Sequence, residues 1–429
     1  MKIELTSDGV VKEGRLHSIN DRYMSLNIRV EGKVRSITSR WKVTSKRVVN
    51  VVIMNLLACV ERKERLYYSR NKQKASKGRY NKRKITTYSI IKAIDEIEAL
   101  GYLVNNMAGQ QFNQEDKMSS YLTPTQAFMD QFCTTTELAI KADRAALLAH
   151  IPIVLRDVKG NIIDYKTTPE IAIMERILDN LNYMNSTHAF VDDDGIEFIN
   201  LYTRIFNNSS FELGGRFFRA AILNMEHKKS KNRLRILIDR QQVVECDYSS
   251  LHLRILAEQL GCIDTLEDDA YMTPLALADC TEANRDLMKL AVNIMLNSTG
   301  RAKATAAIQS HINKCEKGSY CFSSGRDVVD AIYTAFPQFV DSFCQPGSTG
   351  MSLMHYESMM TSFVAHHMTT YNLPVLPVHD SNLCRLEDAD TLIELMSQAY
   401  KHVLKTDKVA RMKLNMIVDN VHVKRDVSC

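Results

Sequence analysis

Apolar residues recur at helical spacing near the start of the chain. Residues 47–60 place aliphatic side chains three or four positions apart, which predicts an amphipathic helix. A second helix is predicted to begin at a capping threonine, Thr86 or Thr87, and to end at Gly101. Its apolar face carries Ile90, Ile94 and Ile97. Residues 102–104 are apolar and predict a short strand after this helix.

The next part of the chain is less regular. Residues 105–125 are polar, and we place a domain boundary inside them, at residue 115. Helical spacing returns in residues 136–149 and 169–181, which predicts two further helices. The aspartates at 192–194 lack the alternating ligand spacing of an EF-hand, so a hairpin turn is predicted there instead.

A predicted strand ends in an acidic residue at Asp247. Residues 243–246 read V-V-E-C and predict the strand, and a helix is predicted to begin near Ser249. A carboxylate at the end of a strand, beside a backbone carbonyl, suits a hard cation such as Mg2+. Acids at strand ends are frequent, so Asp247 alone is weak support for a metal site.

A second acid is predicted at the tip of a hairpin. Residues 376–383 read L-P-V-H-D-S-N-L, in which apolar runs flank a polar turn that holds His379 and Asp380. If this hairpin pairs beside the strand that ends at Asp247, the two carboxylates converge. They can then share two metals ~4 Å apart, the arrangement used for in-line phosphoryl transfer.

A predicted helix that begins after Thr281 lies between these two segments. Arg285, Lys289 and Asn293 are spaced four residues apart and therefore share one face of it. Two cations and an amide on one face suit a polyphosphate with a sugar or a base beyond it. For this helix on its own, a solvated charged face is the alternative.

Composition narrows the class of protein. Of the 429 residues, 45% are hydrophobic and 24% are charged, which is typical of a globular protein with two or three domains. No apolar stretch reaches the ~20 residues that a membrane helix needs, so no membrane partner is expected. The ten cysteines form no C-x2-C pair, and no signal-peptide pattern precedes them. We therefore expect reduced thiols in the cytoplasm rather than a zinc site.

Positive charge is concentrated in the basic block, residues 62–84. The block contains eleven Lys or Arg residues and one acid, so it carries +10, whereas the whole chain carries +5 and the remainder −5. Three tyrosines lie among these cations. This pattern favours a nucleic-acid contact, and a solvated basic loop is the alternative.

Three segments, in this order, resemble motifs of the DNA polymerase I family, family A. The stretch D-Y-S-S-L-H-L-R-I-L, which begins at Asp247, closely resembles motif A, D-Y-S-x-I-E-L-R-I-L. The R-x3-K spacing that begins at Arg285 resembles motif B, and V-H-D at residues 378–380 resembles motif C. The likeness covers roughly residues 200–420. The longer V-H-D-S matches the phage and mitochondrial single-subunit RNA polymerases, which share this palm.

The segments outside these motifs carry two further resemblances. Gly214-Gly215-Arg216, followed by Arg233 and Arg235, resembles the stretch before motif A that grips the primer–template. Nearer the N-terminus, a helix, a linker and a helix ending in I-E-A-L-G-Y-L-V resemble the end of a winged-helix domain.

The winged-helix resemblance makes the second predicted helix the recognition helix. Its first turn, which contains Tyr88, suits DNA, as does Lys92, but Asp95, Glu96 and Glu98 would face phosphates badly. The alternative is that this helix packs on the rest of the protein.

These resemblances imply an α+β fold with two parts. Residues 1–115 would form a small winged-helix-like domain that binds nucleic acid through the basic block. Residues 116–429 would form a compact right-hand polymerase, with fingers over about residues 262–345 and a reduced thumb in residues 125–200.

They also imply a role for each matched residue. Two Mg2+ ions would be held by the catalytic carboxylates and one backbone carbonyl: Asp247, Asp380 and Tyr248. The nucleotide-binding residues would be Arg285, Lys289, Asn293 and His252. The primer–template contacts would be Gly215, Arg216 and His379. In the N-terminal domain, DNA would bind Lys82, Arg83 and Lys84.

The implied activity is template-directed nucleotidyl transfer. A DNA-directed DNA polymerase of a phage or mobile replicon would use a DNA primer–template and nucleoside triphosphates, in the host cytoplasm if phage-encoded. Family A DNA polymerases carry a Glu, which excludes ribonucleotides, where this chain has His252. Motif B also lacks its aromatic at Asn293 or Asn297. One alternative is therefore an RNA polymerase or primase, and another is a DNA-binding replication or regulatory protein that has lost catalysis.

The basic block gives a prediction that is independent of the catalytic motifs. Replacing Lys82, Arg83 and Lys84 by Ala should weaken DNA binding equally across sequences. It should also flatten the plot of log Kd against log salt concentration by ~0.7–0.9 per lost phosphate contact. Fluorescence anisotropy at several salt concentrations measures both effects. An unchanged slope would assign the block to a solvated loop.

Overall fold

The computed structural model divides into two compact units of mixed α and β structure, which confirms the predicted α+β class. Unit 1 comprises Met1–Ile151 and Asn185–Leu201, and unit 2 comprises Pro152–Met184 and Tyr202–Cys429. The structure describes residues 16–18, 34–61, 65–68, 85–106, 120–132, 151–193, 195, 197–198, 200–225, 232–275, 281–316, 318–345, 349–419 and 421–428.

Unit 1 is built on a four-stranded sheet with the order β1-β2-β4-β3. β4 pairs antiparallel with both β2 and β3, and β1 pairs parallel with β2. The strands are β1 (Leu16–Ser18), β2 (Arg65–Tyr68), β3 (Leu103–Asn106) and β4 (Ser120–Pro124). The helices described in unit 1 are α2 (Lys46–Glu61), α3 (Thr87–Ala99) and α4 (Gln126–Phe132). A hairpin joins β7 (Phe190–Val191) and β8 (Glu197–Phe198).

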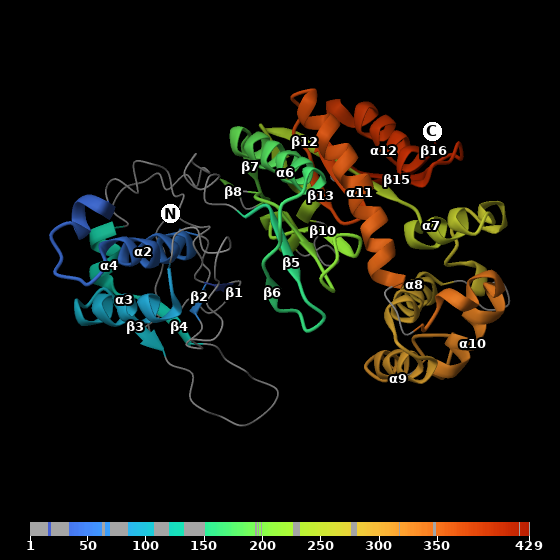
Figure 1. Ribbon diagram of the computed structural model, residues 1–429, viewed down its shortest axis with the longest axis horizontal. Coiled ribbons are helices and arrows are strands. Elements are labelled where there is room, and N and C mark those ends of the chain that lie inside the picture. The colour runs from blue at the N-terminus through green and yellow to red at the C-terminus, as the bar shows by residue number, and fades with distance from the viewer. Residues whose placement is uncertain are drawn as a thin grey trace. The chain divides into compact units, whose positions relative to one another are not determined.

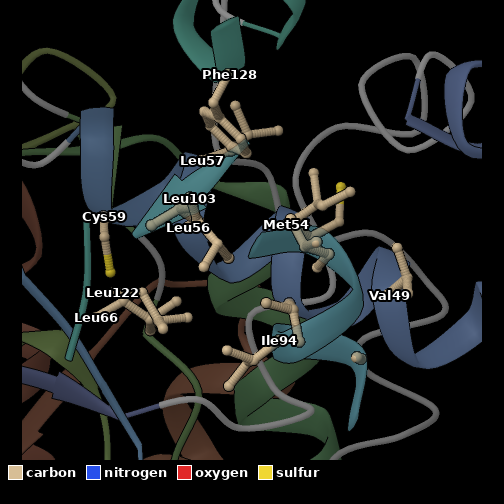
Figure 2. Close-up of a cluster of buried hydrophobic side chains, with 14 of the residues drawn as sticks. Val49, Met54, Leu56, Leu57, Cys59, Leu66, Ile94, Leu103, Leu122 and Phe128 are labelled. Carbon is tan, nitrogen blue, oxygen red and sulfur yellow. The ribbon is translucent and has the colours of Figure 1, made fainter. Parts of the chain in front are cut away.

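The core of unit 1 is formed where α2, α3 and α4 meet the sheet (Figure 2). Each element contributes aliphatic or aromatic side chains that are almost completely buried, and each such aliphatic side chain contributes about 1.5–3 kcal/mol. The labelled members are Val49, Met54, Leu56, Leu57, Cys59, Leu66, Ile94, Leu103, Leu122 and Phe128.

Both helices predicted from the periodicity of this region are confirmed. α2 extends the predicted residues 47–60 by one residue at each end. α3 begins after Thr86, whose side chain accepts from the backbone N–H of Ser89 in a capping box. The strand predicted at residues 102–104 is β3, which begins one residue later and ends two residues later.

The strand β4 was not predicted, because its residues lie in the polar stretch 105–125. Only Ser120 and Leu122 of β4 are buried, so its sequence carries little apolar signal, and pairing with β2 and β3 on both sides stabilises it. Unit 1 therefore continues beyond residue 115. The division into a nucleic-acid-binding domain, residues 1–115, and a polymerase domain, residues 116–429, stays a prediction.

Unit 2 contains two sheets. The smaller has the order β10-β9-β5-β6. In the larger, β12 lies between β14 and β15, β13 and β16 pair with the outer sides of these two, and β11 pairs with the start of β12. The strands are β5 (Ile153–Arg156), β6 (Ile162–Ile163), β9 (Thr203–Phe206), β10 (Gly214–Phe218), β11 (Leu237–Ile238), β12 (Gln241–Tyr248), β13 (Leu376–Val378), β14 (Ser381–Arg385), β15 (Arg411–Val418) and β16 (Val421–Ser428).

Helix α11 connects the parts of unit 2. It contacts strand β10 and helices α7, α8 and α12, and Figure 1 shows it as a long helix (orange) that passes alongside α12 toward α8. The helices are α6 (Pro169–Thr187), α7 (Leu251–Gln259), α8 (Glu282–Asn297), α9 (Arg301–Ile312), α10 (Gly325–Ala335), α11 (Thr349–Thr370) and α12 (Ala389–Leu404).

The remaining sequence predictions have mixed outcomes. The helix predicted at 169–181 is confirmed as the first part of α6. The hairpin turn predicted at the aspartates is confirmed by the pairing of β7 with β8. The helix predicted at 136–149 lies outside the described residues. Within the described part of the chain, no helix is both long and apolar enough to cross a membrane.

Candidate active site

Strand β12 brings Asp247 beside the tip of the β13–β14 hairpin. β12 pairs antiparallel with β14, with Asp247 opposite Ser381. At the end of the ladder, the backbone N–H of Tyr248 donates to the carbonyl oxygen of Asp380 at 3.3 Å. The sequence predicts that the two carboxylates converge if the hairpin pairs beside the strand of Asp247. This pairing is present, and it brings Asp247 and Asp380 together.

The backbone on both sides of this junction is strained. His379, at the hairpin tip, has a φ of +58°, and Ser250, just before α7, has a φ of +52°. A non-glycine residue in the left-handed region is held there at a cost of roughly 1–3 kcal/mol, and such residues cluster at functional sites. Thr361 of α11 holds the hairpin tip by donating its hydroxyl to the His379 carbonyl at 3.3 Å.

The two aspartates carry raised pKa values. Burial is the largest cause for Asp247, followed by the negative charges of Asp380 and Glu245. Burial, followed by the charge of Glu357, raises the pKa of Asp380. Lys289 lowers both pKa values, so α8 presents this ammonium group toward the pair. Two carboxylates with excess negative charge fit a divalent cation that prefers oxygen ligands.

A third acid on β12 is already neutralised. Glu245 lies two residues before Asp247 and therefore on the same face of the strand. Its Oε1 accepts from the Ser381 hydroxyl at 2.6 Å and lies 3.3 Å from Nη2 of Arg233. Arg233, which resembles a primer–template contact, is thus buried against Glu245. Glu245 supports the β12–β14 pairing, and the two aspartates remain for a cation.

The predicted polar face of α8 is present. Thr281 caps the helix by accepting from the N–H of Asn284 at 3.2 Å, as predicted. Lys289 is exposed, and Arg285 and Asn293 are half-buried, whereas the other side of α8 is packed in the core. The structure therefore brings Lys289 near the aspartates.

Asn293 and Asn297, the positions at which the resemblance to motif B implies an aromatic, lie at a helix contact. Asn297 donates its amide to the Asn293 carbonyl at 2.8 Å. The start of α11 approaches Asn297 so closely that a Cβ on Gly350 would lie 2.2 Å from its Oδ1. A side chain at this position would require Asn297 to move, so this end of α8 packs directly on α11.

Arg285 is already bound to an acid in this structure. Its Nε lies 2.6 Å from Oδ2 of Asp269, and the same oxygen lies 3.4 Å from Nζ of Lys413. The guanidinium also lies 5.8 Å from the ring centroid of Tyr271. A triphosphate would have to share Arg285 with Asp269 or displace that carboxylate.

A buried polar cluster joins three elements beside Asp380. Glu357 of α11 forms an ion pair with Arg216 of β10, and its Oε2 lies 3.0 Å from Nε2 of His252 on α7. Burial opposes ionisation of Glu357, but the hydrogen bond to His252 and the charge of Arg216 outweigh it and lower its pKa. The carboxylate of Glu357 is therefore ionised at neutral pH.

Two glycines shape the strand that carries Arg216. Gly214 and Gly215 have φ values of +77° and +79°, and the register of β10 shifts between Gly214 and Arg216. A Cβ on Gly215 would lie 2.5 Å from the ring of Phe206. The buried Arg204 donates from Nε to the Gly215 carbonyl at 2.8 Å and holds this bulge. Gly215 therefore acts through the backbone.

His379 lies between this cluster and the aspartates. Its ring is half-buried, with the ring of Phe218 at 6.2 Å between centroids. Burial, followed by the charge of Arg216, lowers its pKa, so the imidazole is neutral at pH 7. Nδ1 has no hydrogen-bond partner among the described residues.

Some residues of the site were missed by sequence reasoning. Glu357 had a usable signal, because it is the only Asp, Glu, Lys or Arg residue in the 22 residues of α11. A single acid in an otherwise uncharged helix is unusual. Tyr271 and Asp269 had none, since their contacts with Arg285 depend on tertiary packing.

Two of the three acids that counted against DNA binding by α3 are occupied. Glu96 accepts from the backbone N–H of Thr44 at 3.0 Å, and Glu98 accepts from that of Asn105 at 2.8 Å. Tyr88 in the first turn is 61% exposed. Lys82, Arg83 and Lys84, together with most of the basic block, lie outside the described residues.

No protein-family model matches this chain, and no curated protein matches it significantly.

The raised pKa of Asp247 yields a stability prediction. A carboxyl whose pKa is raised by folding stabilises the folded state below its unfolded pKa, and this contribution is lost as the pH rises through the folded pKa. Replacing Asp247 by Asn should therefore stabilise the metal-free protein more at pH 8 than at pH 5, because the amide does not ionise in the folded state. Urea unfolding in EDTA at pH 5 and pH 8 measures this gain.

Magnesium should act in the opposite sense. Added Mg2+ should stabilise the wild type and have little effect on Asp247→Asn, because a ligand that binds only the folded state stabilises it. Asp390→Asn, an exposed acid in α12, is the matched control. Equal responses of the wild type and both variants would contradict a cation site at Asp247.

Proposed function

We propose that this protein is a template-directed nucleotidyltransferase with a right-hand polymerase fold, and that it acts as a DNA-directed DNA polymerase. Unit 2 would supply palm and fingers, with α8, α9 and α10 within the fingers segment of residues 262–345. The observation that carries the proposal is the junction of β12 with the β13–β14 hairpin. It combines motif A, motif C and the Lys289 of motif B around one pair of carboxylates.

The palm sheet supports a two-metal reaction. Asp247 and Asp380, with the backbone carbonyl of Tyr248, would hold two Mg2+ ions, which lower the pKa of the attacking hydroxyl and neutralise the leaving pyrophosphate. The primer 3′-oxygen forms a bond to the α-phosphorus while the bond from that phosphorus to pyrophosphate breaks. The raised pKa values of the aspartates mean that protons compete with the metal, so activity should rise with pH.

The cations around the palm suit the substrates. Lys289 is exposed and faces the carboxylates, where it would bind the triphosphate and neutralise charge on the leaving group. Arg285 and Asn293 would extend this contact along α8. Arg216 and His379 would contact the primer terminus.

Unit 1 would bind the template or duplex. In its sheet, β3 follows α3 directly, and this helix followed by a strand is what supports the winged-helix proposal. Glu96 and Glu98 each accept a backbone N–H, and of the three acids Asp95 and Glu98 are exposed, as are Tyr88 and Lys92. The basic block would add affinity without sequence preference.

Two observations favour functions other than a DNA polymerase. His252, in place of the gating Glu, favours an RNA polymerase or primase of the same palm. The ion pair that occupies Arg285, together with the missing motif B aromatic, favours a DNA-binding protein without catalysis. Extension of primed and unprimed templates, with dNTPs and NTPs in parallel, separates the three.

The two aspartates should both be indispensable for catalysis. Asp247→Asn and Asp380→Asn keep the side-chain shape but weaken Mg2+ binding, so kcat should fall by at least ~1,000-fold, equivalent to ~4 kcal/mol of transition-state stabilisation. DNA affinity, measured by anisotropy, should stay within a few-fold of the wild type. Near-normal extension by Asp380→Asn, at the level of the Asp390→Asn control, would show that the palm assignment is wrong.

His252 should act as the sugar gate. An imidazole is roughly as bulky as the Glu of family A enzymes, so it can obstruct a 2′-hydroxyl. His252→Ala should lower the ratio of kcat/KM for dNTP to that for NTP by at least ~10-fold, or ~1.4 kcal/mol. Single-nucleotide incorporation at a primer end measures this ratio. A wild-type enzyme that prefers NTPs would reject the DNA polymerase assignment in favour of the RNA polymerase or primase.

A further inference from the structure

Glu357 is the least expected group at the site. Its side chain is 1% exposed, and it is the only acidic or basic residue, histidines apart, in α11. A buried carboxylate is costly unless it is paired and hydrogen-bonded. Glu357 meets this condition with partners from two other elements, Arg216 of β10 and His252 of α7.

The pairing fixes the proton on His252. An ionised carboxylate only accepts hydrogen bonds, and the lowered pKa of Glu357 keeps it ionised. Nε2 of His252, 3.0 Å from Oε2, must therefore carry a hydrogen and donate it. This hydrogen bond fixes the orientation of the imidazole ring. It also sets the role of Nδ1, because the partner of one ring nitrogen determines whether the other is protonated.

The two oxygens of the Glu357 carboxylate differ in their hydrogen-bond partners. Oε2 receives both Arg216 and His252, whereas Oε1 is buried without a hydrogen-bond partner among the described residues. An unsatisfied buried acceptor destabilises the fold. The burial of Glu357 therefore does not serve stability alone, which points to a role for Glu357 in the function of the site.

We propose that Glu357 is the positioning residue of the sugar gate. His252 alone is a side chain with two soft torsions, and bulk excludes a 2′-hydroxyl only if the ring is held in one place. Glu357 holds it there from α11, so selection against ribonucleotides is supplied by a His–carboxylate pair drawn from two helices. This inference rests on the proposed polymerase function and names the nucleotide class, deoxynucleoside triphosphates, that the same site selects.

The test is single-nucleotide incorporation with dNTP and NTP by four proteins: wild type, Glu357→Gln, His252→Ala and the double variant. Gln keeps the shape of Glu357 but loses its charge and its hold on the imidazole. Glu357→Gln should lower the dNTP to NTP ratio of kcat/KM by at least ~5-fold, chiefly through a gain in NTP use, with dNTP incorporation retained within ~10-fold.

The double variant separates positioning from a general structural role. If Glu357 acts through His252, the ratio in Glu357→Gln/His252→Ala should equal that of His252→Ala alone, because a residue that acts through a partner has no further effect once the partner is gone. Independent, additive effects would overturn the proposal. So would a folded Glu357→Gln with the wild-type ratio.

Controls cover the fold and the parent hypothesis. Glu258→Gln removes a carboxylate on α7 that accepts from the Tyr400 hydroxyl at 3.1 Å, and it should leave the ratio unchanged. If circular dichroism shows that Glu357→Gln is unfolded, Glu357→Asp replaces it, because the shorter acid keeps the charge but withdraws from His252. A folded Glu357→Asp with the wild-type ratio would also overturn the proposal.

Failure of the proposed function is distinguishable from failure of this inference. A wild-type protein that extends no primer with either nucleotide would overturn both. Extension by the wild type, with a ratio that does not respond to Glu357→Gln or Glu357→Asp, would overturn the positioning role alone.

Discussion

The pairing of β12 with β14 is the constraint on which the rest of the site depends. The register places Asp247 opposite Ser381, so the residue before Ser381 must lie beside the end of β12. Two carboxylates are thereby forced together in a partly buried place, where burial and neighbouring negative charge raise their pKa values. Such a cost is common at functional sites, because the arrangement serves binding of a ligand rather than stability.

The acidic residues around this pair differ from the two aspartates in their ion-pair partners. Glu245 is neutralised by Arg233, and Glu357 by Arg216 and His252. The two aspartates have no comparable ion pair among the described residues, and Lys289 acts on them from the exposed face of α8. All four acids offer the same type of ligand oxygen. The proposed Mg2+ site is therefore assigned to the two aspartates because they lack an ion pair of this kind in the described part of the chain.

Helix α11 fixes the geometry of the site without supplying one of the proposed metal ligands. Gly350 lets its first turn approach Asn297 of α8. Glu357 binds Arg216 and His252, Ser358 accepts from the buried Arg204 at 3.0 Å, and Thr361 donates to the hairpin tip. These contacts are distributed along the helix from Gly350 to Thr361. One rigid element therefore relates β10, α7, α8 and the β13–β14 hairpin to one another.

The sequence by itself determined the local elements and the chemistry of the residues that they carry. The periodicities of α2 and α3, the cap at Thr281, and the strand and hairpin around Asp247 and Asp380 all follow from signals within about fifteen residues. Only the tertiary structure decided which residues meet. β4 has too little apolar sequence to be recognised without its partners. Glu357 lies 105 positions from His252 in the chain, and no local pattern links two residues whose contact depends on helix packing.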